Sequence, residues 1–142
     1  MSVTPRVLIV EDQYFVAVDC ELQLRSAGIE CVGLATTAAE ALDIAEREHP
    51  DFVLMDIRLA SVADGVEAAI VIYERLGIRC IFASAHADSA TRSLAERAHP
   101  LGWLDKPYTG GQLVATVREC LEALRAAQRE SSSTEAAART VH

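Results

Sequence analysis

The sequence predicts an α/β fold in which five short buried strands alternate with five helices in a doubly wound parallel sheet. Short apolar runs recur along the chain, and segments with apolar residues at helical spacing separate them. Acids, a hydroxyl and a lysine directly follow four of these runs. Because each parallel crossover needs a right-handed helical return, we expect helices on both faces of the sheet.

The expected strands are apolar at nearly every position, which is typical of strands that are buried on both faces. They are residues 6–10, 31–35, 52–55 and 78–83, with a brief fifth strand around Trp103. This last strand is the shortest of the five, and it precedes the helix that closes the domain.

Each expected helix has a recognisable start or end. Thr37 and Thr109 open capping boxes, in which a side chain at each end of the motif satisfies a free backbone N–H. Asp88 is the expected N-cap of the fourth helix. Gly28 is the expected left-handed cap that ends the first helix. The helices are expected at about residues 13–27, 37–49, 64–77, 88–99 and 109–126.

Length and composition indicate one ordinary domain with its own core, since 142 residues are 51% hydrophobic. The net charge of -8 argues against nucleic-acid binding, which depends on clustered Lys and Arg. The sequence has no apolar stretch of bilayer-spanning length, and residues 1–5 do not resemble a secretory signal. We therefore expect a cytoplasmic protein without a membrane partner.

The domain is expected to span residues 1–126. From about Ala127 the apolar periodicity ends, so residues 127–142 are expected to be a frayed helix end and a disordered tail. The four cysteines occur singly, without a Cys-x-x-Cys pair, and we interpret them as small buried hydrophobic residues rather than disulfides or metal ligands. They are Cys20, Cys31, Cys80 and Cys120.

Chemically reactive side chains follow the strands at the point where each strand ends. Glu11 and Asp12 follow the first strand, Asp56 the third, Ser84 the fourth and Lys106 the fifth. In an open α/β sheet, ligands bind outside the carboxyl ends of the strands. We therefore expect these five side chains to meet at one edge of the sheet.

This set of side chains is suited to phosphoryl chemistry. Three carboxylates at one place repel one another, so the site needs a cation. Oxygen ligands with room left for water suit Mg²⁺, and the absence of His or Cys among them argues against zinc. Lys106 adds a positive charge and Ser84 a hydroxyl. Together they can hold a phosphoryl group while a carboxylate attacks it in line.

The set Glu11-Asp12, Asp56, Ser84 and Lys106-Pro107 resembles the receiver domain of two-component response regulators, of the stand-alone single-domain type. The resemblance covers about residues 6–124. It implies a flavodoxin-like (βα)5 fold with strand order 2-1-3-4-5. It also implies that Asp56 accepts a phosphoryl group from a histidine of a sensor kinase in a Mg²⁺-dependent reaction.

The resemblance further assigns metal and phosphoryl contacts. Asp12, Asp56 and the backbone carbonyl of Arg58 would ligate Mg²⁺, and Glu11 would hold the metal through water. Lys106 would pair with the phosphoryl oxygens. By this resemblance the protein is not an enzyme acting on other molecules, although it catalyses its own phosphorylation and slow autodephosphorylation.

A second group of residues is implied to report the modification. Ser84 would hydrogen-bond to the phosphoaspartate, and Trp103 would change rotamer as the aromatic switch residue. His86 and Arg58 lie near the mouth of the site and would tune water access. The Lys106–Pro107 peptide bond is expected to be cis.

The implied partners are a sensor histidine kinase or phosphotransfer protein and a downstream protein target or a second copy of the chain. The target would bind the face formed by the fourth helix, fifth strand and last helix. Two alternatives keep the fold: a phosphate shuttle or sink in a phosphorelay, and a phosphorylation-independent interaction module. A phosphohydrolase is disfavoured because it needs a second acid near the nucleophile, whereas Ile57 and Arg58 follow Asp56.

Each assignment has a plainer structural alternative. Glu11 and Asp12 would also suit the start of the first helix, where acids favour the helix dipole. Asp56 and Lys106 would also suit a structural salt bridge. Trp103 would also suit the core, and His86 a solvated loop.

The sequence also departs from the usual receiver pattern. The loop after Asp56 lacks a proline that is common there and is one residue longer than usual. Tyr108 stands where phenylalanine is common, and His99-Pro100-Leu101 replaces the small residues expected before the fifth strand. We therefore expect this chain to differ from its relatives in this loop, in the fourth helix and in the switching surface.

Overall fold

The computed structural model describes residues 4–59 and 64–140, with side chains described up to residue 131. Its sheet has five parallel strands in the order β2-β1-β3-β4-β5, which confirms the predicted fold class and strand order. The strands are β1 (Arg6–Val10), β2 (Glu30–Ala35), β3 (Phe52–Asp56), β4 (Cys80–Ser84) and β5 (Gly102–Asp105).

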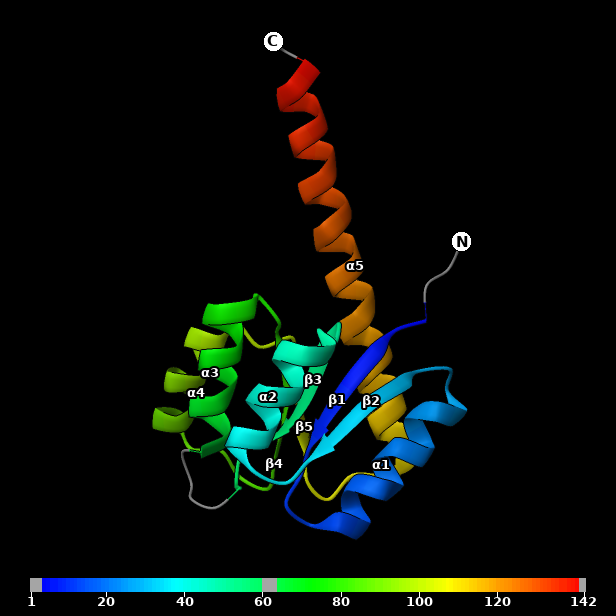
Figure 1. Cartoon of the computed structure of the whole chain (residues 1–142), viewed down its shortest axis with the longest axis vertical. Helices are drawn as coiled ribbons and strands as arrows, with labels where there is room; N and C mark the ends of the chain where they lie inside the picture. Colours follow the sequence, from blue (N-terminus) through cyan, green and yellow to red (C-terminus); the bar gives the residue numbers. More distant parts are fainter. Residues whose placement is uncertain (1–3, 60–63, 141–142) are drawn as a thin grey trace.

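Helices cover both faces of this sheet. Figure 1 shows α2, α3 and α4 gathered on one side and α1 and α5 on the other. Within the described ranges, no helix combines the length and the apolar character that crossing a membrane requires. The helices are α1 (Tyr14–Ser26), α2 (Ala38–Glu48), α3 (Asp64–Leu76), α4 (Ser89–Ala95), the short 3-10 helix η1 (Glu96–Ala98) and α5 (Gly110–Thr140).

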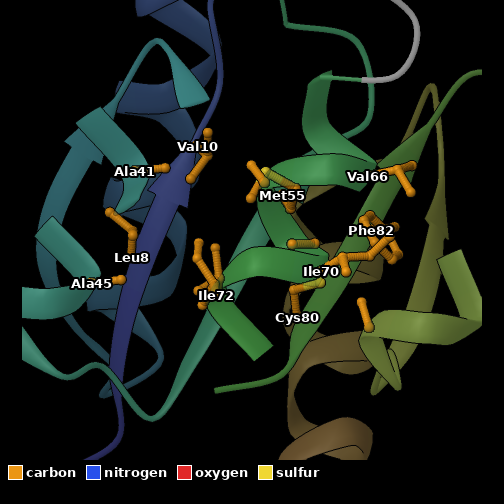
Figure 2. Close-up of a cluster of buried hydrophobic side chains, with 14 of the residues drawn as sticks. Leu8, Val10, Ala41, Ala45, Met55, Val66, Ile70, Ile72, Cys80 and Phe82 are labelled. Carbon is orange, nitrogen blue, oxygen red and sulfur yellow. The ribbon is translucent and has the colours of Figure 1, made fainter. Parts of the chain in front are cut away.

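The apolar strands supply two separate cores because successive side chains point to opposite faces. From β1, Leu8 and Val10 enter the core beneath α2 and α3, which is drawn in Figure 2 with residues such as Met55 and Phe82. The alternate β1 residues and their β3 neighbours enter the core beneath α1 and α5. They are Val7, Ile9, Phe52 and Leu54, all of them buried. A sheet packed on both faces gives the strand ends a fixed position.

The helix ends follow the predicted capping signals. The side chains of Thr37 and Asp88 each accept a hydrogen bond from a backbone N–H in the first turn of α2 and α4. Thr109 and Gln112 form the reciprocal capping box, with bonds of 2.8 and 3.1 Å. Gly28 has a φ of 86°, as expected for a left-handed cap. The fourth helix ends earlier than predicted, because α4 stops at Ala95 and continues as the 3-10 helix η1 to Ala98. The other strand and helix bounds before α5 differ from the prediction by one or two residues.

The last helix differs from the prediction. In the structure α5 continues to Thr140, whereas residues from about Ala127 were expected to fray into a disordered tail. Figure 1 shows this part of α5 projecting away from the sheet. Loss of apolar periodicity indicates that a segment does not pack, but segments rich in Ala, Glu and Arg still favour helix. The domain boundary at residue 126 stays a prediction.

Gly65 lies at the start of α3 against the end of β3. Its N–H donates to the carbonyl oxygen of Ile57 at 3.2 Å. A Cβ atom at this position would overlap the carbonyl oxygen of Asp56 and lie 2.7 Å from that of Ile57. The absence of a side chain therefore lets α3 approach the strand end that carries Asp56. The predicted departure in the preceding loop falls partly on residues 60–63, outside the described residues.

We predict that Gly65→Ala lowers the free energy of unfolding by about 1–3 kcal/mol, the usual cost of overpacking against backbone that cannot move away. Urea denaturation measures this change. Gly111→Ala is the matched control, because its Cβ would meet only the Thr109 hydroxyl at an ordinary 3.8 Å. Equal stability of Gly65→Ala and the wild type would contradict the close approach of α3 to β3.

Candidate functional site

Strand geometry brings three charged side chains together at the carboxyl edge of the sheet, on the face that α1 and α5 cover. One acid directly follows β1, one ends β3, and a lysine begins the β5–α5 loop. Glu11, Asp56 and Lys106 each lie two residues beyond a strand residue that is buried beneath α1 and α5. Those buried residues are Ile9, Leu54 and Leu104. Since β1 and β3 are paired through Val10 and Met55, Glu11 and Asp56 emerge side by side.

The lysine ammonium lies between the two buried acids. Lys106 Nζ is 3.2 Å from Asp56 Oδ1 and 3.7 Å from Glu11 Oε1. Glu11 and Asp56 are 5% and 6% exposed, so these charges interact with little screening by water. The backbone N–H of Arg58 also donates to Asp56 Oδ1, at 3.1 Å. The Asp56 carboxylate is therefore held in one orientation at the end of β3.

Three carboxylates are close enough to share one cation. One oxygen from each of Glu11, Asp12 and Asp56 lies within 4.8 Å of the others. Glu11 Oε2 is buried without a hydrogen-bond partner among the described residues, and such an oxygen is costly unless an ion or water satisfies it. Oxygen ligands of this kind suit Mg²⁺ better than zinc. The residues present therefore fit a magnesium ion.

Crowding also changes the protonation of Glu11. Burial raises its pKa from 4.5 to about 8, the Asp56 carboxylate contributes in the same direction, and Lys106 opposes the change. Without a metal, the crowding therefore favours the protonated form of Glu11. A cation bound to the three acids would favour the deprotonated form instead.

Ser84 and Trp103 lie on the other face of the sheet, towards α4. Ser84 is buried at the end of β4, two residues after Phe82 in the core beneath α3. Phe82 pairs in register with Trp103, and their ring centroids are 5.0 Å apart. The Arg92 guanidinium of α4 lies 4.3 Å from the centroid of the Trp103 ring. Trp103 is therefore partly buried between β4 and a cation from α4.

Two further predicted residues lie at the rim of the site. Arg58 is exposed in the loop after β3, and His86 is exposed in the loop after β4. Their predicted influence on water access, and the predicted metal contact of the Arg58 carbonyl, stay predictions.

A cleft of about 600 Å³ borders the acids on the side of α1. Exposed Phe15 and the ring of Tyr108 contribute to its walls, and the buried Cys20 thiol lies 3.1 Å from the Tyr108 hydroxyl. Cys20 is not predicted in this site from the sequence. All four cysteines are free and buried, as predicted. The sequence offers one signal for this contact: Tyr108 carries a hydroxyl at a position where phenylalanine is common.

Comparison with known proteins decides the family. A model of the response regulator receiver domain matches residues 7–118. The chain belongs to this family. As in the prediction, the Lys106–Pro107 peptide bond of this receiver domain is cis.

The receiver domain is similar to several regulators. It is 32% identical over 127 residues to the transcriptional regulatory protein PdtaR of Mycobacterium tuberculosis, covering 87% of this chain and 60% of that protein. It is 35% identical to the crystal structure of the response regulator PhyR from Brucella abortus, with a TM-score of 0.78, covering 91% of this chain and 52% of that one. The receiver domain thus spans only about half to three-fifths of these relatives.

A solved structure of similar size also matches. The signal receiver domain of a modulated diguanylate cyclase from Desulfovibrio desulfuricans G20 is 32% identical, with a TM-score of 0.76. That match covers 85% of this chain and 96% of the other. The similarity therefore extends over nearly the whole of that receiver domain.

We predict that the metal-free receiver domain loses stability as pH rises from about 4.5 to 8, because the folded state retains the Glu11 proton in this window and the unfolded chain releases it. The slope from this one proton is at most about 1.4 kcal/mol per pH unit. Glu11→Gln is expected to flatten the profile, and saturating Mg²⁺ is expected to reduce the wild-type decline. Thermal unfolding across this pH range measures both, and identical profiles for wild type and Glu11→Gln would contradict the assignment.

Proposed function

We propose that Asp56 of this receiver domain accepts a phosphoryl group from a sensor histidine kinase or phosphotransfer protein in a Mg²⁺-dependent reaction. The observation that carries the proposal is the Asp56 carboxylate, oriented by the Arg58 N–H and placed 3.2 Å from Lys106 Nζ beside an acid cluster of suitable ligands. Membership in the receiver family supports the same role.

The proposed step is an in-line displacement. A free oxygen of the Asp56 carboxylate forms a bond to phosphorus as the bond from phosphorus to the donor histidine nitrogen breaks, and the imidazole leaves with that electron pair. Glu11, Asp12 and Asp56 would hold Mg²⁺, which supplies positive charge for the phosphoryl oxygens. Lys106 would then exchange its contact with Asp56 for the transferred oxygens and neutralise part of their charge.

The proposed output is a change in protein binding on the face formed by α4, β5 and α5. Asp56 pairs in register with Ala83, so Ser84 is the next residue on the neighbouring strand. A hydroxyl there is suited to bind a new phosphoryl oxygen, and Trp103 lies on the same face of β5 beneath α4. Phosphorylation would shift an existing equilibrium between two arrangements of this face. A downstream protein or a second copy of the chain would bind one of them.

The rest of the proposal concerns the setting of the protein. A cytoplasmic location suits a partner of sensor kinases, and the net charge of -8 disfavours nucleic acid as the direct target. A role as phosphate shuttle or sink uses the same site and differs only in where the phosphoryl group goes next.

We predict a mass gain of one phosphoryl group when the protein is incubated with Mg²⁺ and acetyl phosphate, and no gain for Asp56→Asn. Intact-protein mass spectrometry measures the gain, which is expected to disappear in base, as an acyl phosphate does. Asp43→Asn is the matched control, since Asp43 is an exposed acid on α2 paired with Arg47. Full labelling of Asp56→Asn would contradict Asp56 as the acceptor, and no labelling of the wild type with any phosphodonor would favour an interaction module.

We predict that the fluorescence of Trp103, the single tryptophan of the chain, changes on phosphorylation. In Arg92→Gln the equilibrium is expected to move about two- to fivefold towards the phosphorylated arrangement, because a cation–π contact of about 0.5–1 kcal/mol is lost. Arg97→Gln is the control, because Arg97 pairs with exposed Glu74 away from the ring. An unchanged emission in phosphorylated wild type would exclude Trp103 as a switch residue.

A further inference from the structure

A hydrogen bond between α1 and the β5–α5 loop lies beside the acid and lysine cluster. It joins Cys20 Sγ to the Tyr108 hydroxyl at 3.1 Å, across 88 positions of the sequence. We propose that this bond positions the loop that carries Lys106 and thereby sets the rate of phosphoryl transfer to Asp56. The inference rests on the proposed function and names two positioning residues for it.

Both partners of the hydrogen bond are at least partly shielded from water, which otherwise competes for the bond. Cys20 is 2% exposed, and Tyr108 is partly buried against the core beneath α1 and α5. Burial raises the pKa of both groups, so each is neutral near pH 7 and has a hydrogen to donate. A phenylalanine at position 108 would fill the ring space without making this bond.

The pair shares its surroundings with the reacting groups. Cys20 and Tyr108 line the same small internal cavity as Glu11, Asp56 and Lys106, with a volume of about 10 Å³. On this internal side there is almost no free space between the pair and the cluster, whereas on the other side both border the open cleft of about 600 Å³. A shift of the Tyr108 ring towards the internal cavity would therefore be transmitted to Lys106 rather than absorbed.

The loop has few other attachments. The Lys106 N–H donates to the Ser84 carbonyl oxygen at 2.8 Å, and Thr109 and Gln112 form the capping box of α5. Among the hydrogen bonds of the described residues, the bond between Tyr108 and Cys20 is the one that joins this loop to α1. Pro107 has no N–H to add another.

The bond also connects the two sides of the site. α1 begins at Tyr14, directly after the loop that carries Glu11 and Asp12. Cys20 therefore belongs to the helix that follows the two acids, and Tyr108 lies two residues after the lysine. Fixing Cys20 to Tyr108 holds the lysine side at a set separation from the acid side. In-line transfer depends strongly on such placement.

The test is a double-mutant cycle on the initial rate of phosphorylation by acetyl phosphate at saturating Mg²⁺. We expect Tyr108→Phe and Cys20→Ala each to slow the reaction about three- to tenfold, the effect of one lost hydrogen bond. The double variant is expected to be no slower than either single variant, because both remove the same bond. Cys20→Ser, which retains a donor, is expected to recover most of the rate.

Controls separate this role from loss of folding. Cys31→Ala removes another buried thiol of the same core from β2, away from the reacting groups, and is expected to leave the rate unchanged. Urea denaturation of each variant gives the folded fraction, which must stay near one under the assay conditions. A purely structural role predicts the same loss of stability in Cys20→Ser and Cys20→Ala without recovery of the rate.

The outcomes separate a failure of the positioning role from a failure of the proposed function. No labelling of wild-type protein would overturn the proposed function itself. Labelling of the wild type with unchanged rates in Tyr108→Phe and Cys20→Ala, or with additive losses in the double variant, would overturn only the positioning role. Coupled losses with recovery by Cys20→Ser would support it.

Discussion

Crowding of like charge at one edge of the sheet is the constraint on which the site depends. Register places Glu11 and Asp56 side by side, Asp12 adds a third acid, and Lys106 supplies one positive charge against them. The excess negative charge must be compensated by a proton or a cation, and the raised pKa of Glu11 reflects this requirement. The two packed cores hold the strand ends in place against this repulsion.

The alternation of side chains along the strands places the proposed reacting groups on one face of the sheet and the proposed switch residues on the other. Glu11, Asp56 and Lys106 project towards α1 and α5, whereas Ser84 and Trp103 project towards α4. Asp56 is the point of contact between the two sets, because its register partner Ala83 precedes Ser84. Under the proposed function, a modification made on one face would therefore reach the other through adjacent residues of neighbouring strands. No long chain of contacts across the core is needed for this route.

Features with a repeating pattern were predictable, and single long-range pairs were not. Strand periodicity and capping boxes determine the order of elements, and the position of each reactive residue at a strand end brings the acids to Lys106. The contact of Cys20 with Tyr108 joins residues 88 positions apart, and the Tyr108 hydroxyl indicates a polar partner without indicating which residue it is. Likewise, the local sequence does not indicate that Arg92 lies over Trp103. The full length of α5 is not predictable in this way, because the loss of an apolar stripe after residue 126 indicates a lack of packing and not a lack of helix.

The features that distinguish this receiver domain from its relatives are residues that border the acid and lysine set, not the set itself. The set itself is what membership in the family leads one to expect, so it explains the type of chemistry but not its rate or its partner. Tyr108 with Cys20 borders the lysine, and Arg92 with Trp103 borders the switching face. Each pair adds a weak interaction beside a group that must move or be held during transfer. Weak interactions at such positions can change a rate or a two-state equilibrium severalfold without altering the fold, which makes them suitable sites for divergence within a family.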